Sequence, residues 1–192
     1  MPVREDAFLH YQKLLSDIEV ITKSLKERFS QKITCHLGCV GCCQQQLTLS
    51  LIEADFISLT IRNLPTDQQQ KILLAAQDIK NKTNKTDTCP LLDGFACSIY
   101  KSRPVICRTH GFPITFKDEE SEEIFLDVCP LNFSEDGESV ELNLTDTIDI
   151  DRLNLRLAAI NYTYSSDKLG DGKKSAERME MSEIIISALG DL

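Results

Sequence analysis

Eight cysteines carry most of the reactive chemistry of this 192-residue chain, and four of them fall between residues 35 and 43. The first group has the spacing C-x3-C-x2-C-C and consists of Cys35, Cys39, Cys42 and Cys43. The other four lie farther apart and are Cys89, Cys97, Cys107 and Cys129. Isolated buried thiols do not gather in this way, so packing of the core does not explain the pattern. Disulfides, a catalytic thiol and metal ligation are the remaining interpretations.

A disulfide framework fits the even number of cysteines but not the compartment that the sequence predicts. The N-terminal region carries Glu5 and Asp6 and no uninterrupted apolar stretch, so it does not resemble a secretory signal. No apolar run elsewhere has the length of a membrane span. We therefore expect a cytoplasmic protein without a membrane partner, and a reducing cytosol keeps thiols free. This favours metal ligation by all eight cysteines.

The spacing of the first group limits the kind of metal site. Positions 35, 39, 42 and 43 would share one face of a regular helix, but Gly38 and Gly41 disfavour such a helix and predict a loop or single turn. Cys39 and Cys42 form the C-x2-C pair that is common in zinc sites. The adjacent Cys43 is easier to explain if it serves a second ion or another corner of a polynuclear cluster. Eight thiolates suit two four-thiolate sites, or one [4Fe–4S] cluster with other roles for the remaining cysteines.

The second group of cysteines is embedded in a longer motif. Residues 97–108 read C-x-I-Y-x-x-R-P-x-x-C-R, with a Cys-Pro pair upstream at position 89 and another downstream at position 129. Together with residues 35–43, this motif resembles the YkgJ-type cysteine-cluster family, which is described as zinc- or iron-chelating. The resemblance covers about residues 35–130, and the chain has one residue more between its first two cysteines than the C-x2-C-x2-C-C form. It implies a bound metal or iron–sulfur cluster and no particular reaction.

Three polar residues beside the second group are candidates for supporting the metal ligands. Four thiolates around zinc or an oxidised [4Fe–4S] cluster leave net negative charge, which Arg103 and Arg108 could offset while donating hydrogen bonds to sulfur. The alternative is that Arg103 makes a surface ion pair. His110 could be a further ligand or the base of a Cys–His pair, although the nearby thiols are all expected to bind metal.

The remaining sequence predicts a mostly α (α+β) fold, a small metal-organised helical domain with a short β-hairpin. Apolar residues at spacings of three and four predict a helix at 5–30, which could pack on its own domain or mediate oligomerisation. Ser50 and Glu53 form a capping box that opens the next helix. The further predicted elements are helices at 67–82, 147–163 and 174–189, a hairpin at 112–116 and 123–128, a loop at 81–88, and a loop with one strand at 134–145.

We expect three parts in the chain: an N-terminal amphipathic helix (1–34), a cysteine-cluster metal-binding domain (35–133) and a C-terminal helical segment packed on it (134–192). Hydrophobic residues make up 42% of the sequence, which suits a folded core. The net charge of -9 opposes phosphate binding, so nucleic acid is not an expected partner.

Two functional hypotheses follow from these observations. In the first, an iron–sulfur cluster or zinc ion held by thiolates serves redox, sensing or metal transfer. In the second, zinc only organises the fold, and the helices of this non-enzymatic module bind another protein. An enzyme acting at the metal is a third interpretation, and the sequence shows no substrate pocket that would support it.

Overall fold

The computed structural model describes residues 2–36, 38–81, 88–133 and 142–190. It is 58% helical with small, short sheets, which confirms the mostly α (α+β) fold. Within the described residues the α-helices are α1 (Pro2–Arg28), α2 (Leu51–Arg62), α3 (Thr66–Lys80), α4 (Val105–Thr109), α5 (Ile150–Leu169) and α6 (Met181–Leu189).

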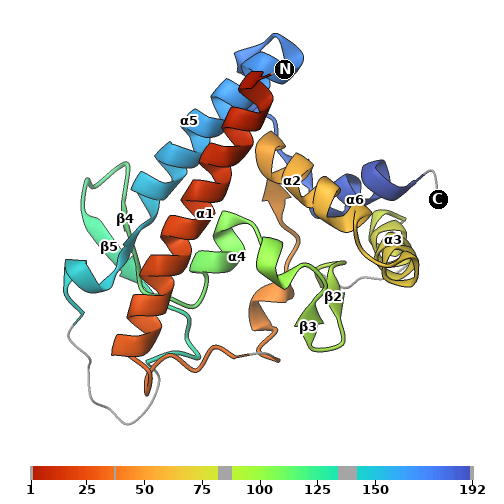
Figure 1. Ribbon diagram of the computed structural model, residues 1–192. Coiled ribbons are helices and arrows are strands. Elements are labelled where there is room, and N and C mark those ends of the chain that lie inside the picture. Colours follow the sequence, from red (N-terminus) through yellow and green to blue (C-terminus); the bar gives the residue numbers. More distant parts are fainter. Residues whose placement is uncertain (1, 37, 82–87, 134–141, 191–192) are drawn as a thin grey trace.

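Two helical groups flank the cysteine region (Figure 1). The long helices α1 and α5 lie side by side and run in opposite directions, and their inner faces form one apolar core with residues such as Tyr11, Ile18 and Leu157. The apolar stripe of α1 is thus buried against the chain's own core. The second core lies between α2, α3 and α6 and includes Ile57 and Ile185.

The start of α2 follows the predicted capping box. The Ser50 hydroxyl donates a hydrogen bond to the Glu53 carboxylate over 2.8 Å, and the Ser50 backbone N–H donates to the same oxygen over 3.2 Å. Because these bonds satisfy groups that the first helical turn leaves without partners, α2 begins immediately after Ser50. Both side chains are buried, so this helix start belongs to the interior of the protein.

Short strands tie the helices together. β4 (Ile114–Lys117) and β5 (Ile124–Asp127) form the predicted hairpin, and β4 also pairs in parallel with β6 (Ile148–Asp149). A second hairpin pairs β2 (Leu92–Asp93) with β3 (Ala96–Cys97). β1 (Thr48–Leu49) pairs with β7 (Met179–Glu180), which brings the start of α6 next to the start of α2. The sequence did not predict this last pairing.

The C-terminal helices differ from their predicted bounds. The prediction ended one helix at residue 163, whereas α5 continues to Leu169 and ends at Gly170, whose φ of 66° is left-handed. Ser165 and Ser166 are helical, and their hydroxyls donate to carbonyls one turn earlier, over 2.7 Å and 2.9 Å. The last helix was predicted from residue 174 but begins only at Met181, because the preceding backbone forms a 3-10 turn and β7.

The predicted loops at 81–88 and 134–145 fall largely outside the described residues. No helix in the described part of the chain is both long and apolar enough to cross a membrane.

Candidate metal centre

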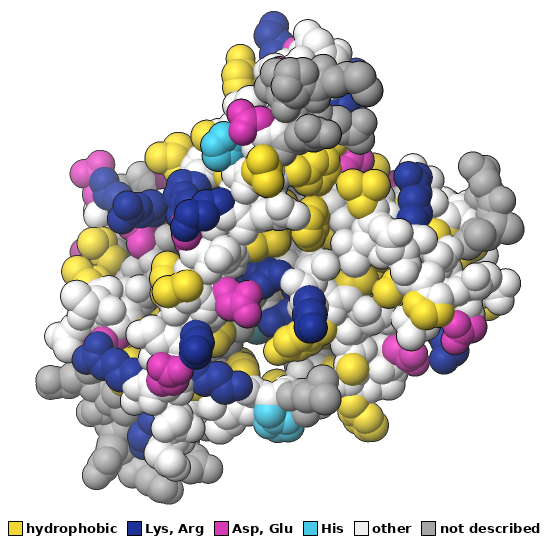
Figure 2. Space-filling model, viewed as in Figure 1, with side chains coloured by type: hydrophobic (Ala, Val, Ile, Leu, Met, Phe, Trp, Pro, Cys, Tyr) yellow, Lys and Arg dark blue, Asp and Glu magenta, His cyan; other side chains and the backbone are white. Residues whose placement is uncertain are grey.

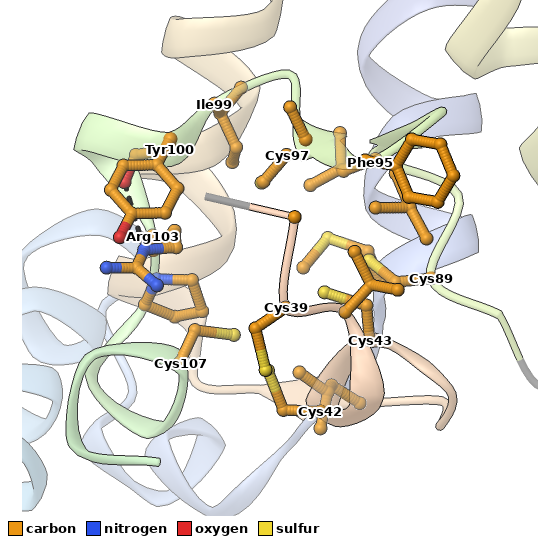
Figure 3. A pocket seen from close by; sticks show the side chains of 18 of the residues that line it. Cys39, Cys42, Cys43, Cys89, Phe95, Cys97, Ile99, Tyr100, Arg103 and Cys107 are labelled. Atoms are coloured by element: carbon orange, nitrogen blue, oxygen red, sulfur yellow. Dashed lines mark hydrogen bonds between the residues drawn. The ribbon is translucent and has the colours of Figure 1, made fainter. Parts of the chain in front are cut away.

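Three segments that are distant in sequence line one cavity with thiols. The first is the loop that leads into the 3-10 helix η1 (Gly41–Cys43), the second is the β2–β3 hairpin with its approach, and the third is α4. Figure 3 shows these segments facing one another across the cavity. The thiols that line it belong to Cys39, Cys42, Cys43, Cys89, Cys97 and Cys107.

The cysteine loop is formed by tight turns, as its glycines predict. Gly38 has a φ of +100°, a backbone conformation that residues other than glycine rarely adopt. The Cys39 N–H donates to the carbonyl of His36 over 3.1 Å, and the Cys43 N–H donates to that of Val40 over 2.9 Å. The two turns direct Cys39, Cys42 and Cys43 toward the same cavity. A regular helix would instead have aligned these side chains along one helical face.

The hairpin is fixed to this loop by its backbone. The Cys89 N–H donates to the carbonyl of Cys43 over 2.7 Å, so the two groups of cysteines are joined at this point. Cys97 on β3 pairs with Leu92 on β2, and the Ser98 N–H donates to the Leu91 carbonyl over 2.8 Å. The pairing returns the chain toward Cys89, which explains how residues eight positions apart line the same cavity.

A buried carboxylate positions the helix that carries Cys107. Glu53 is only 2% exposed, and one of its carboxylate oxygens accepts a hydrogen bond from the N–H of Val105 over 3.1 Å. The other oxygen takes part in the capping box of α2. A single side chain therefore joins the first turns of α2 and α4, and the carboxylate is favourable at both of these positively polarised ends.

The cavity itself is small and mostly apolar. Its volume is about 60 Å³, and its walls include Leu91, Ile99 and Met181 as well as the six thiols. Phe95, at the tip of the hairpin, is 75% exposed and stands at its edge. In the space-filling view this face is hollowed near its centre, with Lys and Arg side chains around the hollow (Figure 2).

Burial raises the pKa of five of the lining thiols, those of Cys42, Cys43, Cys89, Cys97 and Cys107, and so favours their protonated form in the absence of a cation. Burial raises the pKa of Cys89 to about 12 and, with repulsion from Cys43, the pKa of Cys42 to about 11. Burial likewise raises the pKa of Cys107, and neighbouring thiolates would raise it further. A cation in the cavity would reverse this balance, because it stabilises thiolates.

Arg103 is the guanidinium that lines the cavity. Its Nε donates to the carbonyl of Tyr100 over 3.0 Å, and its guanidinium carbon lies 3.8 Å from the centre of the Tyr100 ring. Its charge partly offsets the effect of burial on the pKa of Cys43, Cys97 and Cys107. This placement agrees with a supporting role next to thiolates.

Arg108 and His110 occupy other positions. The Arg108 Nε donates to the carbonyl of Arg103 over 2.8 Å, and one terminal nitrogen lies 3.8 Å from the Glu19 carboxylate on α1. Arg108 therefore supports the backbone of the 101–108 segment and is not among the residues that line the cavity. His110 is exposed and also lies outside this lining.

Two of the eight cysteines lie beside the cavity instead of in its wall. The Sγ of Cys35 accepts a hydrogen bond from Asn132 Nδ2 over 3.3 Å and packs against the core between α1 and α5. The carbonyl of Cys129 accepts from the N–H of Asn132 over 2.8 Å. The two ends of the cysteine region thus meet at Asn132.

The donor set suits a thiophilic metal, since six thiols and no carboxylate line the cavity. Among the residues that the structure describes, no three Cys, His, Asp or Glu side chains already form an arrangement that could hold a metal ion. Zinc–sulfur bonds are about 2.3 Å long, so ligation would draw the thiols together from their present positions. Rotation of cysteine side chains in the irregular 38–47 loop can supply part of that movement.

Three residues at the cavity were not expected from the sequence. His36 lines it and is a potential nitrogen ligand, which its position next to Cys35 could have suggested. Phe95 and Met181 also line it, the latter from the start of α6. No local signal in the sequence places Met181 there, because the placement depends on the pairing of β1 with β7.

A known family matches the part of the chain that carries the cysteines. Residues 34–130 match the model of the family CxxCxxCC, described as "Putative zinc- or iron-chelating domain". The chain belongs to this family. The matched region contains all eight cysteines and begins and ends within one residue of the first and last of them. No curated protein and no solved structure matches the chain.

Membership in this family confirms the resemblance carried by the two cysteine motifs and supports metal binding in general. The family description names zinc and iron together.

Proposed function

We propose that this chain is a metal-binding protein that holds an iron–sulfur cluster through cysteine thiolates in the cavity between the 38–47 loop, the β2–β3 hairpin and α4. The observation that carries the proposal is that thiols from three separate segments line one small cavity. Six thiols are enough for the four thiolates of a [4Fe–4S] cluster, and the adjacent Cys42 and Cys43 suit two corners of such a polynuclear centre. A bound cluster would supply reversible one-electron chemistry suited to redox, sensing or transfer.

The residues around the cavity suit such a centre. Arg103 offsets thiolate charge, and the apolar walls limit contact with water, two factors that set the reduction potential of a cluster. The exposed Phe95 leaves one edge of the cavity accessible. The cytoplasmic location expected from the sequence would keep the thiols reduced and available as ligands.

A structural zinc site is the second candidate. It is favoured by the lack of buried side chains in the 38–47 loop, which therefore needs another source of stability. In this case the metal would hold the loop to the hairpin and α4, and the outer helices would bind a protein partner.

Elemental analysis and a visible spectrum of anaerobically purified protein distinguish the two candidates. Iron together with acid-labile sulfide and broad visible absorption is expected for the cluster. Zinc in a colourless sample would support the structural site and overturn the cluster. Protein free of both metals, after purification without chelators, would contradict the metal-binding function itself.

A matched pair of variants tests ligation by the cavity thiols. Cys43→Ser should lower the metal content, because it removes a thiolate from the cavity. Gln45→Ser introduces the same side chain at an exposed position in the same loop and should leave the metal content unchanged. Equal metal content in both variants would exclude Cys43 as a ligand.

A further inference from the structure

A second hollow, which we call the α4–α5 cleft, shares α4 as a wall with the cavity of the cysteines. Val105 and Ile106 of α4 line the cleft, whereas Cys107 of the same helix lines the cavity. None of the described residues that line the cleft is a cysteine. Its volume is about 460 Å³, within the range of about 300–1,000 Å³ that is typical of small-molecule sites. The cleft is therefore large enough for a small organic molecule.

The walls of the cleft are mostly apolar. One wall is a single face of α5, formed by residues at helical spacings: Ile150, Asn154, Leu157, Ala158 and Asn161. Leu49 of β1 adds apolar surface beside the two residues of α4. Such walls suit the hydrocarbon part of a ligand, and the few polar groups among them would fix its orientation.

Asn161 holds three segments together at the cleft. Its side chain is 2% exposed, and its Oδ1 accepts a hydrogen bond from the N–H of Ile52 at the start of α2 over 3.0 Å. Its Nδ2 donates to the carbonyl of Ser175 over 2.8 Å. Because α2, α5 and the 172–176 turn are joined by one amide, the shape of the cleft is set before any ligand enters.

Glu53 supplies the only carboxylate among the described residues that line the cleft. It is buried and accepts hydrogen bonds from the N–H and hydroxyl of Ser50 and from the N–H of Val105. An ionised carboxylate has about four lone-pair positions, so one of them has no donor in the described part of the chain. No Lys, Arg or His in that part forms an ion pair with Glu53. A positively charged ligand group would stabilise this buried charge.

Arg178 supplies the guanidinium of the cleft. The register of β1 and β7 pairs Leu49 with Met179, and its continuation sets Arg178 opposite Ser50. The Arg178 Nε donates to the Thr48 hydroxyl over 3.1 Å, and its Nη2 donates to the Thr48 carbonyl over 2.6 Å. Within the described residues its Nη1 has no hydrogen-bond partner, and the side chain makes no ion pair. A donor with full positive charge is thus held beside the cleft.

We propose that the α4–α5 cleft binds a small zwitterion of the amino-acid class, with its ammonium group at Glu53, its carboxylate at Arg178 and its side chain against the apolar walls. Both charged residues lie next to Ser50, one through its side-chain bonds and the other through the strand register. A ligand with only a carboxylate would be repelled by Glu53, and one with only an ammonium group would leave Arg178 unpaired. The inference goes beyond metal binding and does not depend on it.

Thermal unfolding of the full-length protein, as purified, tests the proposal with each of the twenty standard L-amino acids as the probe. At least one of them should raise the melting temperature, because a ligand that binds only the folded state stabilises it. Isothermal titration calorimetry then gives its affinity and stoichiometry, with one molecule expected per chain. Absence of a shift with all twenty would overturn the proposal.

Two analogues of the tightest-binding amino acid test the zwitterionic character of the site. The amide lacks the carboxylate, and the deaminated acid lacks the ammonium group. Each loses one charged contact and should bind at least about tenfold more weakly. An analogue that binds as tightly as the amino acid would overturn the assignment of the missing group.

A charge variant tests the carboxylate position. Arg178→Gln should weaken binding at least about tenfold, because it removes the charged donor from the cleft. Arg152→Gln removes the same charge from an exposed position on α5 outside the lining and should leave the affinity unchanged. Equal affinity of the two variants would overturn the role of Arg178.

A blocking variant tests the location independently of charge. Ala158→Phe places a ring in the cleft and should abolish binding, whereas Leu155→Phe alters a side chain of the same helix that is 72% exposed and outside the lining. Circular dichroism verifies that both variants fold. Full affinity in folded Ala158→Phe would place the ligand elsewhere and overturn the proposal. Metal content measured on the same samples should stay at the parent level, so a failure here is distinguishable from a failure of the proposed function.

Discussion

The 38–47 loop lines the cavity that the α2–α3–α6 group reaches through Met181, but the two regions obtain their stability differently. The helices bury Ile57, Ile61 and Ile185 against one another, and each fully buried aliphatic side chain contributes about 1.5–3 kcal/mol. No residue between 38 and 47 is buried, and this loop contains only one turn of 3-10 helix. The helices can thus fold on their apolar content, whereas we expect the stability of the loop to depend on what its thiols bind.

The largest effect should come from removing the metal. Chelation should accelerate amide hydrogen exchange in the 38–47 loop and the β2–β3 hairpin, while α1, α2, α5 and α6 keep their protection. Binding free energy at such sites is also folding free energy, so we expect the melting temperature to fall by roughly 10 °C or more. An unchanged melting temperature would refute the dependence of this region on metal.

A void created by substitution in the α2–α3–α6 core should have the next largest effect. Ile57→Ala removes a side chain that is 0% exposed and should lower the free energy of unfolding by about 2–5 kcal/mol, as for other buried aliphatic truncations. Its control, Ile106→Ala on α4, alters a side chain that is 47% exposed and should cost less than about 0.5 kcal/mol. Urea unfolding of the metal-loaded proteins measures both, and similar losses would argue against separate sources of stability.

Two glycine substitutions compare the close packing around Cys35 with the open surroundings of the β2–β3 hairpin. Gly111→Ala places a Cβ 2.6 Å from the Cys35 sulfur, whereas Gly94→Ala meets nothing within 4 Å, and both positions have left-handed backbone. Because the backbone strain is shared, the clash should make Gly111→Ala less stable than Gly94→Ala by about 1–3 kcal/mol. Thermal unfolding of both variants provides the comparison, and equal stability would show that Cys35 adjusts without cost.

The smallest effect concerns pH. The raised pKa of Cys89 and Cys42, to about 12 and about 11, means that the metal-free thiols bind protons at neutral pH. Metal binding must release these protons, so apparent affinity should rise with pH by up to about tenfold per pH unit for each proton released. Chelator competition at pH 6.5, 7.5 and 8.5 measures this slope. An affinity that is independent of pH would indicate ligands other than these thiols.

Local features of the fold could be predicted because they depend on residues close in sequence. The spacing of Tyr11, Ile18 and Leu25 fixed the inner face of α1, and Ser50 with Glu53 marked the start of α2. Gly38 and Gly41 excluded a regular helix in the cysteine loop, where tight turns are found. The division of the chain at residues 34 and 133 stays a prediction.

Errors occurred where local signals competed with distant contacts. One helix was predicted to end at residue 163, but α5 continues through Ser165 and Ser166, whose hydroxyls bond to carbonyls within it, to Leu169. The late start of α6 follows from the pairing of β7 with β1, more than a hundred residues away. Sequence periodicity contains no information about such a partner.

The sequence by itself determined that this protein carries clustered thiols suited to a thiophilic metal, because the type and spacing of the ligands depend only on residues close together in the chain. The tertiary structure decided which thiols line one cavity and which lie beside it. It placed Cys35 and Cys129 at Asn132, Arg103 in the cavity wall, and Arg108 and His110 away from it. These positions arise from backbone hydrogen bonds and packing between segments up to a hundred residues apart, so only the folded chain defines them.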